Sequence, residues 1–182
     1  MNYQGELEKF RMKIGYESLL VRKDIVTDEK VREKCKVDTS NYGKNYACPP
    51  FSPVITQFKK RNIFIYLLYI QGKEIEKWDL LAKLIFDYGK KLEKELAGIC
   101  LIAGPCKLCK SCKAETAETC PFPQERRYSF TGVGLDTEKL NKILRRKIIW
   151  DNRYISAVGG CLTDKEGVDS DKLFSILQGE RG

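Results

Sequence analysis

The sequence contains no histidine among its 182 residues. Without imidazole, the protein cannot have a Ser-His-Asp triad, a Cys-His pair, an imidazole general base or a histidine metal ligand. It also lacks a long hydrophobic run, because the longest, residues 63–70, falls far short of the roughly 20 residues of a membrane-spanning helix. Chemistry must therefore come from cysteine, carboxylate, lysine or tyrosine side chains, or from a group that the cysteines hold.

The first residues lack the basic segment followed by an apolar segment that marks a secretory signal. We therefore expect a cytoplasmic protein with no membrane contact, in which the eight cysteines serve as metal ligands rather than disulfides. The 33 Lys and Arg residues outnumber the 25 Asp and Glu residues and give a formal charge of +8. This surplus favours an acidic protein partner, and because no nucleic-acid-binding signature accompanies it, we do not expect nucleic acid.

The length and the 42% hydrophobic content predict a single domain over residues 1–182 with its own core. Hydrophobic periodicity and capping residues predict strands over residues 14–26, 62–71, 99–103 and 153–162, and helices over residues 27–35, 75–97, 136–148 and 169–179. This order predicts an α/β or α+β fold with a central sheet of about four strands, packed helices and a cysteine-rich loop, residues 104–135, at one end.

The cysteine-rich loop carries the strongest motif in the sequence. Cys106, Cys109 and Cys112 are each separated by two residues, and Cys120, followed by Pro121, comes after a longer gap. Three thiols at this spacing, with a more distant fourth, are typical of a [4Fe–4S] cluster. Structural zinc more often uses two separated Cys-x₂-Cys pairs, and a redox-active Cys-x-x-Cys dithiol would leave the other cysteines unused. The motif therefore predicts an iron–sulfur cluster, with zinc as the alternative metal.

The remaining cysteines are more scattered. Cys48 lies in a proline-rich loop, Cys161 follows two glycines where backbone can approach closely, and Cys100 lies in an apolar strand, where we expect a core residue. We expect Cys35 and Cys48, with Cys161 as a third thiol, to form a second metal site or to complete the first. The competing interpretation is that these are three unrelated buried thiols.

Three segments resemble a cysteine-rich family described as predicted metal-binding proteins, a domain of unknown function (2284). They are Tyr-Gly-Lys-Asn-Tyr-Ala-Cys-Pro-Pro at residues 42–50, Ala-Gly-Pro-Cys-Lys-Leu-Cys-Lys-Ser-Cys at residues 103–112, and Cys-Pro-Phe-Pro at residues 120–123 with Arg126, Arg127, Ser129 and residues 134–136. The resemblance covers roughly residues 30–162. The family motif has a further cysteine between the positions of Cys35 and Cys48, where this chain has Thr39-Ser40-Asn41. The resemblance implies a metal or iron–sulfur centre and names no reaction.

Three functions fit these motifs. The first is a small iron–sulfur protein with at least one [4Fe–4S] cluster, which transfers electrons or supports redox or metallocofactor chemistry with an acidic redox protein or enzyme. The second is an enzyme that uses an open cluster position as a Lewis acid or redox catalyst, because an incomplete second site would leave such a position. The third is a zinc-stabilised interaction module. Iron, sulfide and zinc content separates the third from the first two.

Overall fold

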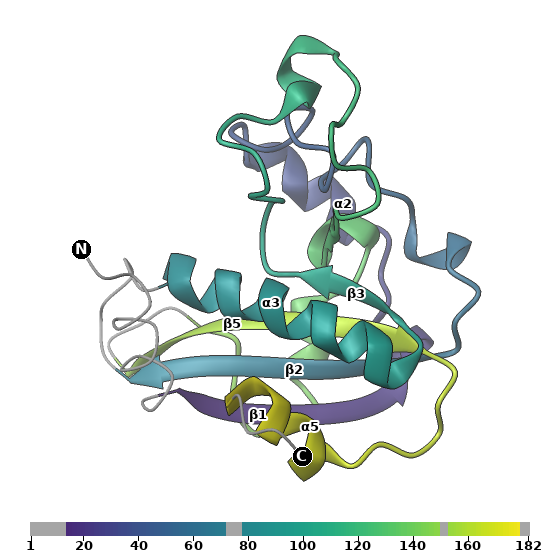
Figure 1. Ribbon diagram of the computed structural model, residues 1–182, viewed down its shortest axis with the longest axis vertical. Helices are drawn as coiled ribbons and strands as arrows, with labels where there is room; N and C mark the ends of the chain where they lie inside the picture. The colour runs from purple at the N-terminus through teal and green to yellow at the C-terminus, as the bar shows by residue number, and fades with distance from the viewer. Residues whose placement is uncertain (1–13, 72–77, 150–152, 179–182) are drawn as a thin grey trace.

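The computed structural model describes residues 14–71, 78–149 and 153–178. Within them the chain forms one five-stranded sheet in the order β1-β2-β5-β3-β4 (Figure 1). Neighbouring strands are antiparallel except β3 and β4, which are parallel. The strands are β1 (Gly15–Arg22), β2 (Asn62–Gln71), β3 (Ile99–Ile102), β4 (Tyr128–Ser129) and β5 (Tyr154–Thr163), and the helices are α2 (Val31–Lys34), α3 (Trp78–Leu96), α4 (Thr137–Leu140) and α5 (Ser170–Gln178).

The centre of the sheet is the pair of strands β2 and β5, which are in register from Asn62 opposite Thr163 to Gln71 opposite Tyr154. Both strands are covered on both faces, which explains their nearly unbroken apolar sequences. Alternate side chains of β2 point to opposite faces: Phe64 and Tyr66 pack under α3 and α5, while Ile63 and Ile65 pack against the other layer. Two hydrophobic cores therefore sandwich the sheet.

Two stretches of chain project from the β3 and β4 edge of the sheet as a separate lobe (Figure 1). We call residues 31–53 together with residues 104–127 the cysteine lobe. The chain enters it from β3 through Gly104, whose φ of +68° favours glycine. A Cβ atom at Gly104 would also lie 2.7 Å from the indole of Trp78, so this turn packs directly on the start of α3.

The predicted strand over residues 14–26 is too long, because β1 ends at Arg22 and residues 23–26 form a 3₁₀ turn. The ammonium group of Lys23 donates to the backbone carbonyls of Ile55 and Phe58. The hydroxyl of Thr27 donates to the carbonyl of Lys23 at 2.7 Å. These contacts with the loop before β2 bend the chain away from the sheet.

The predicted helix over residues 136–148 is also too long. Asp136 caps the helix, as its carboxylate accepts from the backbone N–H groups of Glu138 and Lys139, but α4 ends at Leu140. Farther on, the N–H groups of Arg145 and Arg146 donate to the carboxylate of Glu17 on β1, at 2.7 and 2.8 Å. A contact with a distant strand therefore replaces the helical hydrogen bonds that the periodicity predicts.

The predicted helix over residues 27–35 begins too early, because Thr27 pairs with Leu135 in an isolated β-bridge and α2 starts only at Val31. The remaining predicted elements lie close to their observed positions. The strand at residues 62–71 is confirmed, and those predicted at 99–103 and 153–162 agree with β3 and β5 within one residue at each end. The described part of the predicted helix at 75–97 is α3; residues 75–77, like Gly179 at the end of the last helix, lie outside the described residues. The mixed α/β fold is confirmed, with β4 as an additional short strand inside the cysteine-rich loop.

Candidate metal centre

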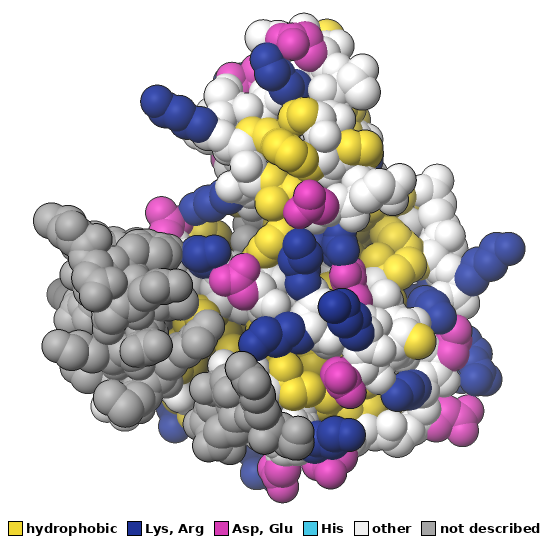
Figure 2. All heavy atoms as spheres, in the orientation of Figure 1, with side chains coloured by type: hydrophobic (Ala, Val, Ile, Leu, Met, Phe, Trp, Pro, Cys, Tyr) yellow, Lys and Arg dark blue, Asp and Glu magenta, His cyan; other side chains and the backbone are white. Residues whose placement is uncertain are grey.

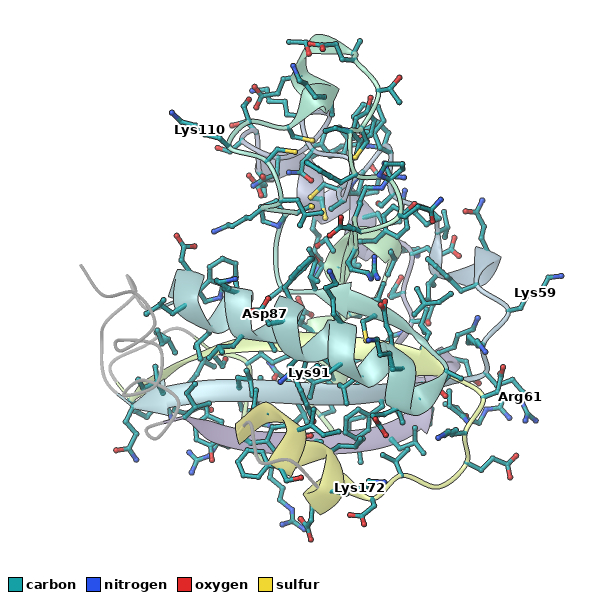
Figure 3. The ribbon with its side chains drawn as sticks, in the orientation of Figure 1. Lys59, Arg61, Asp87, Lys91, Lys110 and Lys172 are labelled. Carbon is teal, nitrogen blue, oxygen red and sulfur yellow. The ribbon has the colours of Figure 1, made fainter. Side chains whose placement is uncertain are left out.

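The four thiols of the main motif line one small pocket in the cysteine lobe. Cys106, Cys109, Cys112 and Cys120 all contribute to its wall, and each is partly exposed. In Figure 3, sulfur atoms gather in the lobe above the sheet, between its two chain segments. The fold therefore brings together the four cysteines that the spacing predicts as ligands.

Cys106 is hydrogen-bonded in a way that suits a thiolate ligand. Burial raises the pKa of its thiol, while the backbone N–H groups of Leu108 and Arg127 donate to the sulfur and act in the opposite direction. Amide hydrogen bonds to ligand sulfurs are a regular feature of iron–sulfur sites, where they stabilise negative charge on sulfur. The backbone around Cys106 is thus arranged for a charged sulfur.

Asn45 joins the two segments of the cysteine lobe. Its amide nitrogen donates to the backbone carbonyl of Cys106 at 3.0 Å, and its carbonyl oxygen accepts from the N–H groups of Cys106 at 3.3 Å and Ala47 at 3.0 Å. Nearby, the hydroxyl of Tyr46 donates to the backbone carbonyl of Glu118 at 2.7 Å. These hydrogen bonds hold the proline-rich loop against the cysteine-rich loop.

Arg126 reaches the same pocket as the four thiols. Its guanidinium group lies over the rings of Tyr46 and Tyr128, at 5.4 and 5.3 Å from the ring centres, and donates to the Tyr128 hydroxyl at 3.2 Å. The Nε atom of Arg126 is buried and has no hydrogen-bond partner among the described residues. A buried N–H without an acceptor costs about 1–3 kcal/mol. A sulfur-rich anionic group in this pocket would supply the missing acceptor, so the residues present fit such a group.

Cys48 lies beside the four-thiol pocket. Burial, with the neighbouring Cys35, Asp38, Cys106 and Cys112, raises the pKa of Cys48 to about 12. Burial also raises the pKa of Cys35, which is only half-buried. The fold therefore brings Cys35 and Cys48 toward each other and toward the main motif, as the sequence predicts.

Cys161 lies elsewhere. It is directly opposite Cys100 in the β3–β5 pair, the two side chains are hydrogen-bonded, and their exposed fractions are 0% and 1%. Both belong to the core under α3, where a Cβ atom at Gly98 would lie 2.5 Å from the sulfur of Cys161. The core interpretation of Cys100 is confirmed. Cys161 shares that core, and the structure does not bring it to Cys35 and Cys48.

Asn45, Tyr46 and Arg126 belong to the segments that resemble the family, but their contacts in the site were not predicted. Asn45 and Tyr46 lie just before Cys48 in the Asn-Tyr-Ala-Cys segment, and Arg126 follows Cys120 by six positions. These spacings are not typical of a known ligand set, so only the fold reveals the contacts. In the part of the chain that the structure describes, no three Cys, Asp or Glu side chains are grouped as ligands of a single metal ion.

Comparison with known proteins identifies the family of the chain. The family model described as "Predicted metal-binding protein (DUF2284)" matches residues 18–162. The chain belongs to this family. The family region runs from β1 to β5 and includes both segments of the cysteine lobe. Searches of curated proteins and of solved structures gave no match. None of the described helices is long and apolar enough to cross a membrane.

Proposed function

We propose that this member of the predicted metal-binding family carries one [4Fe–4S] cluster on Cys106, Cys109, Cys112 and Cys120 and exchanges single electrons with a protein partner in the cytoplasm. The observation that carries the proposal is the pocket itself, which is lined by four thiols and by Arg126, whose Nε atom is buried without a partner among the described residues. When bound, the cluster supplies one-electron redox chemistry. The protein holds it, donates hydrogen bonds to its sulfurs and limits its contact with water.

The spacing of the thiols supports a cluster over zinc. Cys106, Cys109 and Cys112 are each separated by two residues and Cys120 follows as a more distant fourth, which is typical of a [4Fe–4S] cluster. Structural zinc more often uses two separated Cys-x₂-Cys pairs.

The charge of the chain supports an acidic partner. A [4Fe–4S]²⁺ core with four thiolates carries −2, so the loaded protein would keep a net charge of about +6. Lys44 and Lys110 are exposed on the cysteine lobe and have no ion pair among the described residues. Lys110 points away from the lobe into solvent (Figure 3), and hydrophobic side chains show between the charged groups of the same lobe (Figure 2). This combination suits a transient protein contact close to the cluster.

Metal analysis tests the proposal directly. Protein purified under strictly anaerobic conditions is expected to be brown, with about four irons and four labile sulfides per chain. Reduction with dithionite should give the EPR signal of a one-electron-reduced cluster. An acidic plant-type ferredoxin, pre-reduced and mixed in a stopped-flow cell, should reduce the protein at a rate that falls with rising salt. Colourless protein with one stoichiometric zinc and no sulfide would overturn the proposal.

A large cavity favours the enzyme as the second candidate function. It has a volume of about 960 Å³, a size typical of small-molecule sites, and lies between β5 and the cysteine lobe. Its wall includes Asp38 of the loop between Cys35 and Cys48, and Pro105 and Lys107 on either side of Cys106. The enzyme requires an iron with an open position, which Cys35 and Cys48 could provide by holding a second iron or replacing Cys120.

Exogenous cyanide distinguishes the two candidates. A cluster with four cysteine ligands should keep its EPR spectrum when cyanide is added, whereas an iron with an open position should bind cyanide and shift the spectrum. Iron counting on Cys48→Ser reports on the second site. Unchanged iron and sulfide content in this variant would mean that the protein carries a single cluster and has no second site. Loss of iron would assign Cys48 as a ligand.

A further inference from the structure

We propose that Arg126 sets the reduction potential of the cluster, by placing a partly buried positive charge and an N–H donor beside it. This inference rests on the proposed function and concerns a residue outside the ligand set. It assigns Arg126 as a positioning and tuning residue, because it would act on the cluster without binding iron.

The guanidinium group of Arg126 is held in place from both sides. The ring of Tyr46 belongs to the proline-rich loop and the ring of Tyr128 to β4, so Arg126 lies between the two segments that enclose the pocket. The hydrogen bond from Nη2 to the Tyr128 hydroxyl fixes the orientation of the guanidinium group. Although Nη2 is hydrogen-bonded, the buried Nε atom remains a donor without an acceptor. Nothing in the contacts among the described residues satisfies it, and the four thiols line the same pocket.

Lys113, the other cation that lines the pocket, is paired, as are the nearby Lys107 and Arg127, whereas Lys110, which has no ion pair among the described residues, points into solvent. Lys113 forms an ion pair with Glu118 at 3.1 Å, and Lys107 with Asp79 at 2.5 Å. Arg127 forms a paired contact with Glu93, with both N–O distances at 2.5 Å. Arg126 has no carboxylate partner in the described part of the chain. Of the two cations that line the pocket, Arg126 is therefore the one whose charge is not offset by a carboxylate of the described residues.

Reduction of the cluster adds one electron, so its total charge with four thiolates goes from −2 to −3 while the partner is oxidised by one electron. A fixed positive charge stabilises the −3 state more than the −2 state, and partial burial strengthens this difference by lowering the effective dielectric constant. Hydrogen bonds to cluster sulfurs act in the same direction. Arg126 should therefore raise the reduction potential, and its removal should favour the oxidised cluster.

The test is an anaerobic redox titration of the intact protein, followed by EPR, on wild type, Arg126→Gln, Arg126→Lys and Lys113→Gln. Arg126→Gln is expected to shift the equilibrium toward the oxidised cluster by about tenfold, which is about 59 mV for one electron. Arg126→Lys keeps the charge but loses the Nε donor, so it should lie between the wild type and Arg126→Gln. Lys113→Gln removes one charge from the same pocket wall, but this charge is exposed and paired, so the shift should stay below about threefold.

The iron and sulfide content of every variant is measured first. If Arg126→Gln and Arg126→Lys keep the cluster and match the potential of Lys113→Gln, Arg126 only supports the tyrosine contacts and the inference is overturned. If Arg126→Gln does not assemble a cluster, the inference is overturned when the reduction potential of Arg126→Lys equals that of the wild type. Failure of the proposed function is distinct, since it would appear as zinc or absent sulfide in the wild-type protein.

Discussion

The sheet layer and the cysteine lobe hold their cysteines in opposite environments. Cys100 and Cys161 face each other inside an apolar core and have almost no exposed surface. The other six thiols lie in the lobe, where five are partly exposed and the surrounding contacts are mainly hydrogen bonds from polar side chains. Hydrophobic burial stabilises the first region without help. The second has few apolar anchors, so its order depends on polar contacts and on the group that it holds.

The strongest test of this comparison replaces one thiol in each region with serine. Cys112→Ser should reduce bound iron and sulfide by about tenfold or more, because it removes a proposed ligand. Cys161→Ser should keep the full iron content and lower the free energy of unfolding by about 1–3 kcal/mol, because it places a hydroxyl in the apolar core. Metal analysis and urea unfolding measure the two effects. Equal iron content in both variants would show that the lobe thiols are not the ligands.

Removal of the metal should affect the two regions differently. Chelation or oxidation should expose residues 104–127 to proteases while the sheet layer remains resistant, because a long loop with little apolar burial gains its order from the centre. Limited proteolysis with mass spectrometry, before and after anaerobic chelation, checks this outcome. Identical cleavage patterns would mean that contacts such as those of Asn45 are sufficient to order the lobe.

Prediction from the sequence succeeded where local pattern and tertiary environment agree. The strand at residues 62–71 is continuous and apolar because it is buried on both faces, so its boundaries were visible in the sequence. The cysteine spacing named four thiols that line one pocket, and their role as cluster ligands stays a prediction. The helix predicted as far as residue 148 failed at its far end because Glu17, more than a hundred residues earlier, accepts the N–H groups of Arg145 and Arg146.

The parts of the site that the sequence did not predict depend on long-range contacts. Asn45 contacts Cys106 and Tyr46 contacts Glu118 across more than sixty positions. Cys161 could not be assigned because glycines before a cysteine fit both a ligand and a core residue. The register that pairs Cys161 with Cys100 places it in the core, and this register is a property of the sheet as a whole.

The ion pair between Arg127 and Glu93 joins the two regions and provides a smaller test. It links the end of the cysteine lobe to α3, and the exposed fractions of its two side chains are 16% and 18%. Glu93 also accepts the N–H of Cys100 at 2.9 Å. Glu93→Gln should lower the free energy of unfolding by about 2 kcal/mol, since these are charge-assisted and partly buried hydrogen bonds. The matched control is Glu118→Gln, whose pair with Lys113 is exposed and should contribute much less to stability. Equal effects in urea unfolding would contradict the proposed link.

The smallest expected effect is a pH dependence that originates at Cys48. Burial raises the pKa of this thiol to about 12, whereas an unfolded cysteine has a pKa of about 8.5. Above pH 8.5 the unfolded chain loses a proton that the folded metal-free protein retains, so stability is complete below this pH and falls as the pH rises toward 12. Between pH 8 and pH 9 the loss should be about 0.7 kcal/mol.

The Cys48→Ala variant isolates this contribution, because it retains every other titrating group. In metal-free protein, the difference in unfolding free energy between wild type and variant should therefore decrease from pH 8 to pH 9. In metal-loaded protein the sign depends on ligation: a thiolate bound to iron releases its proton on binding, so higher pH would then strengthen the wild type relative to the variant. A decrease in both forms would leave Cys48 as a buried neutral thiol beside the cluster. A reversal of the pH dependence on metal loading would instead assign Cys48 as a metal ligand, and the proline-rich loop would then be part of the metal centre.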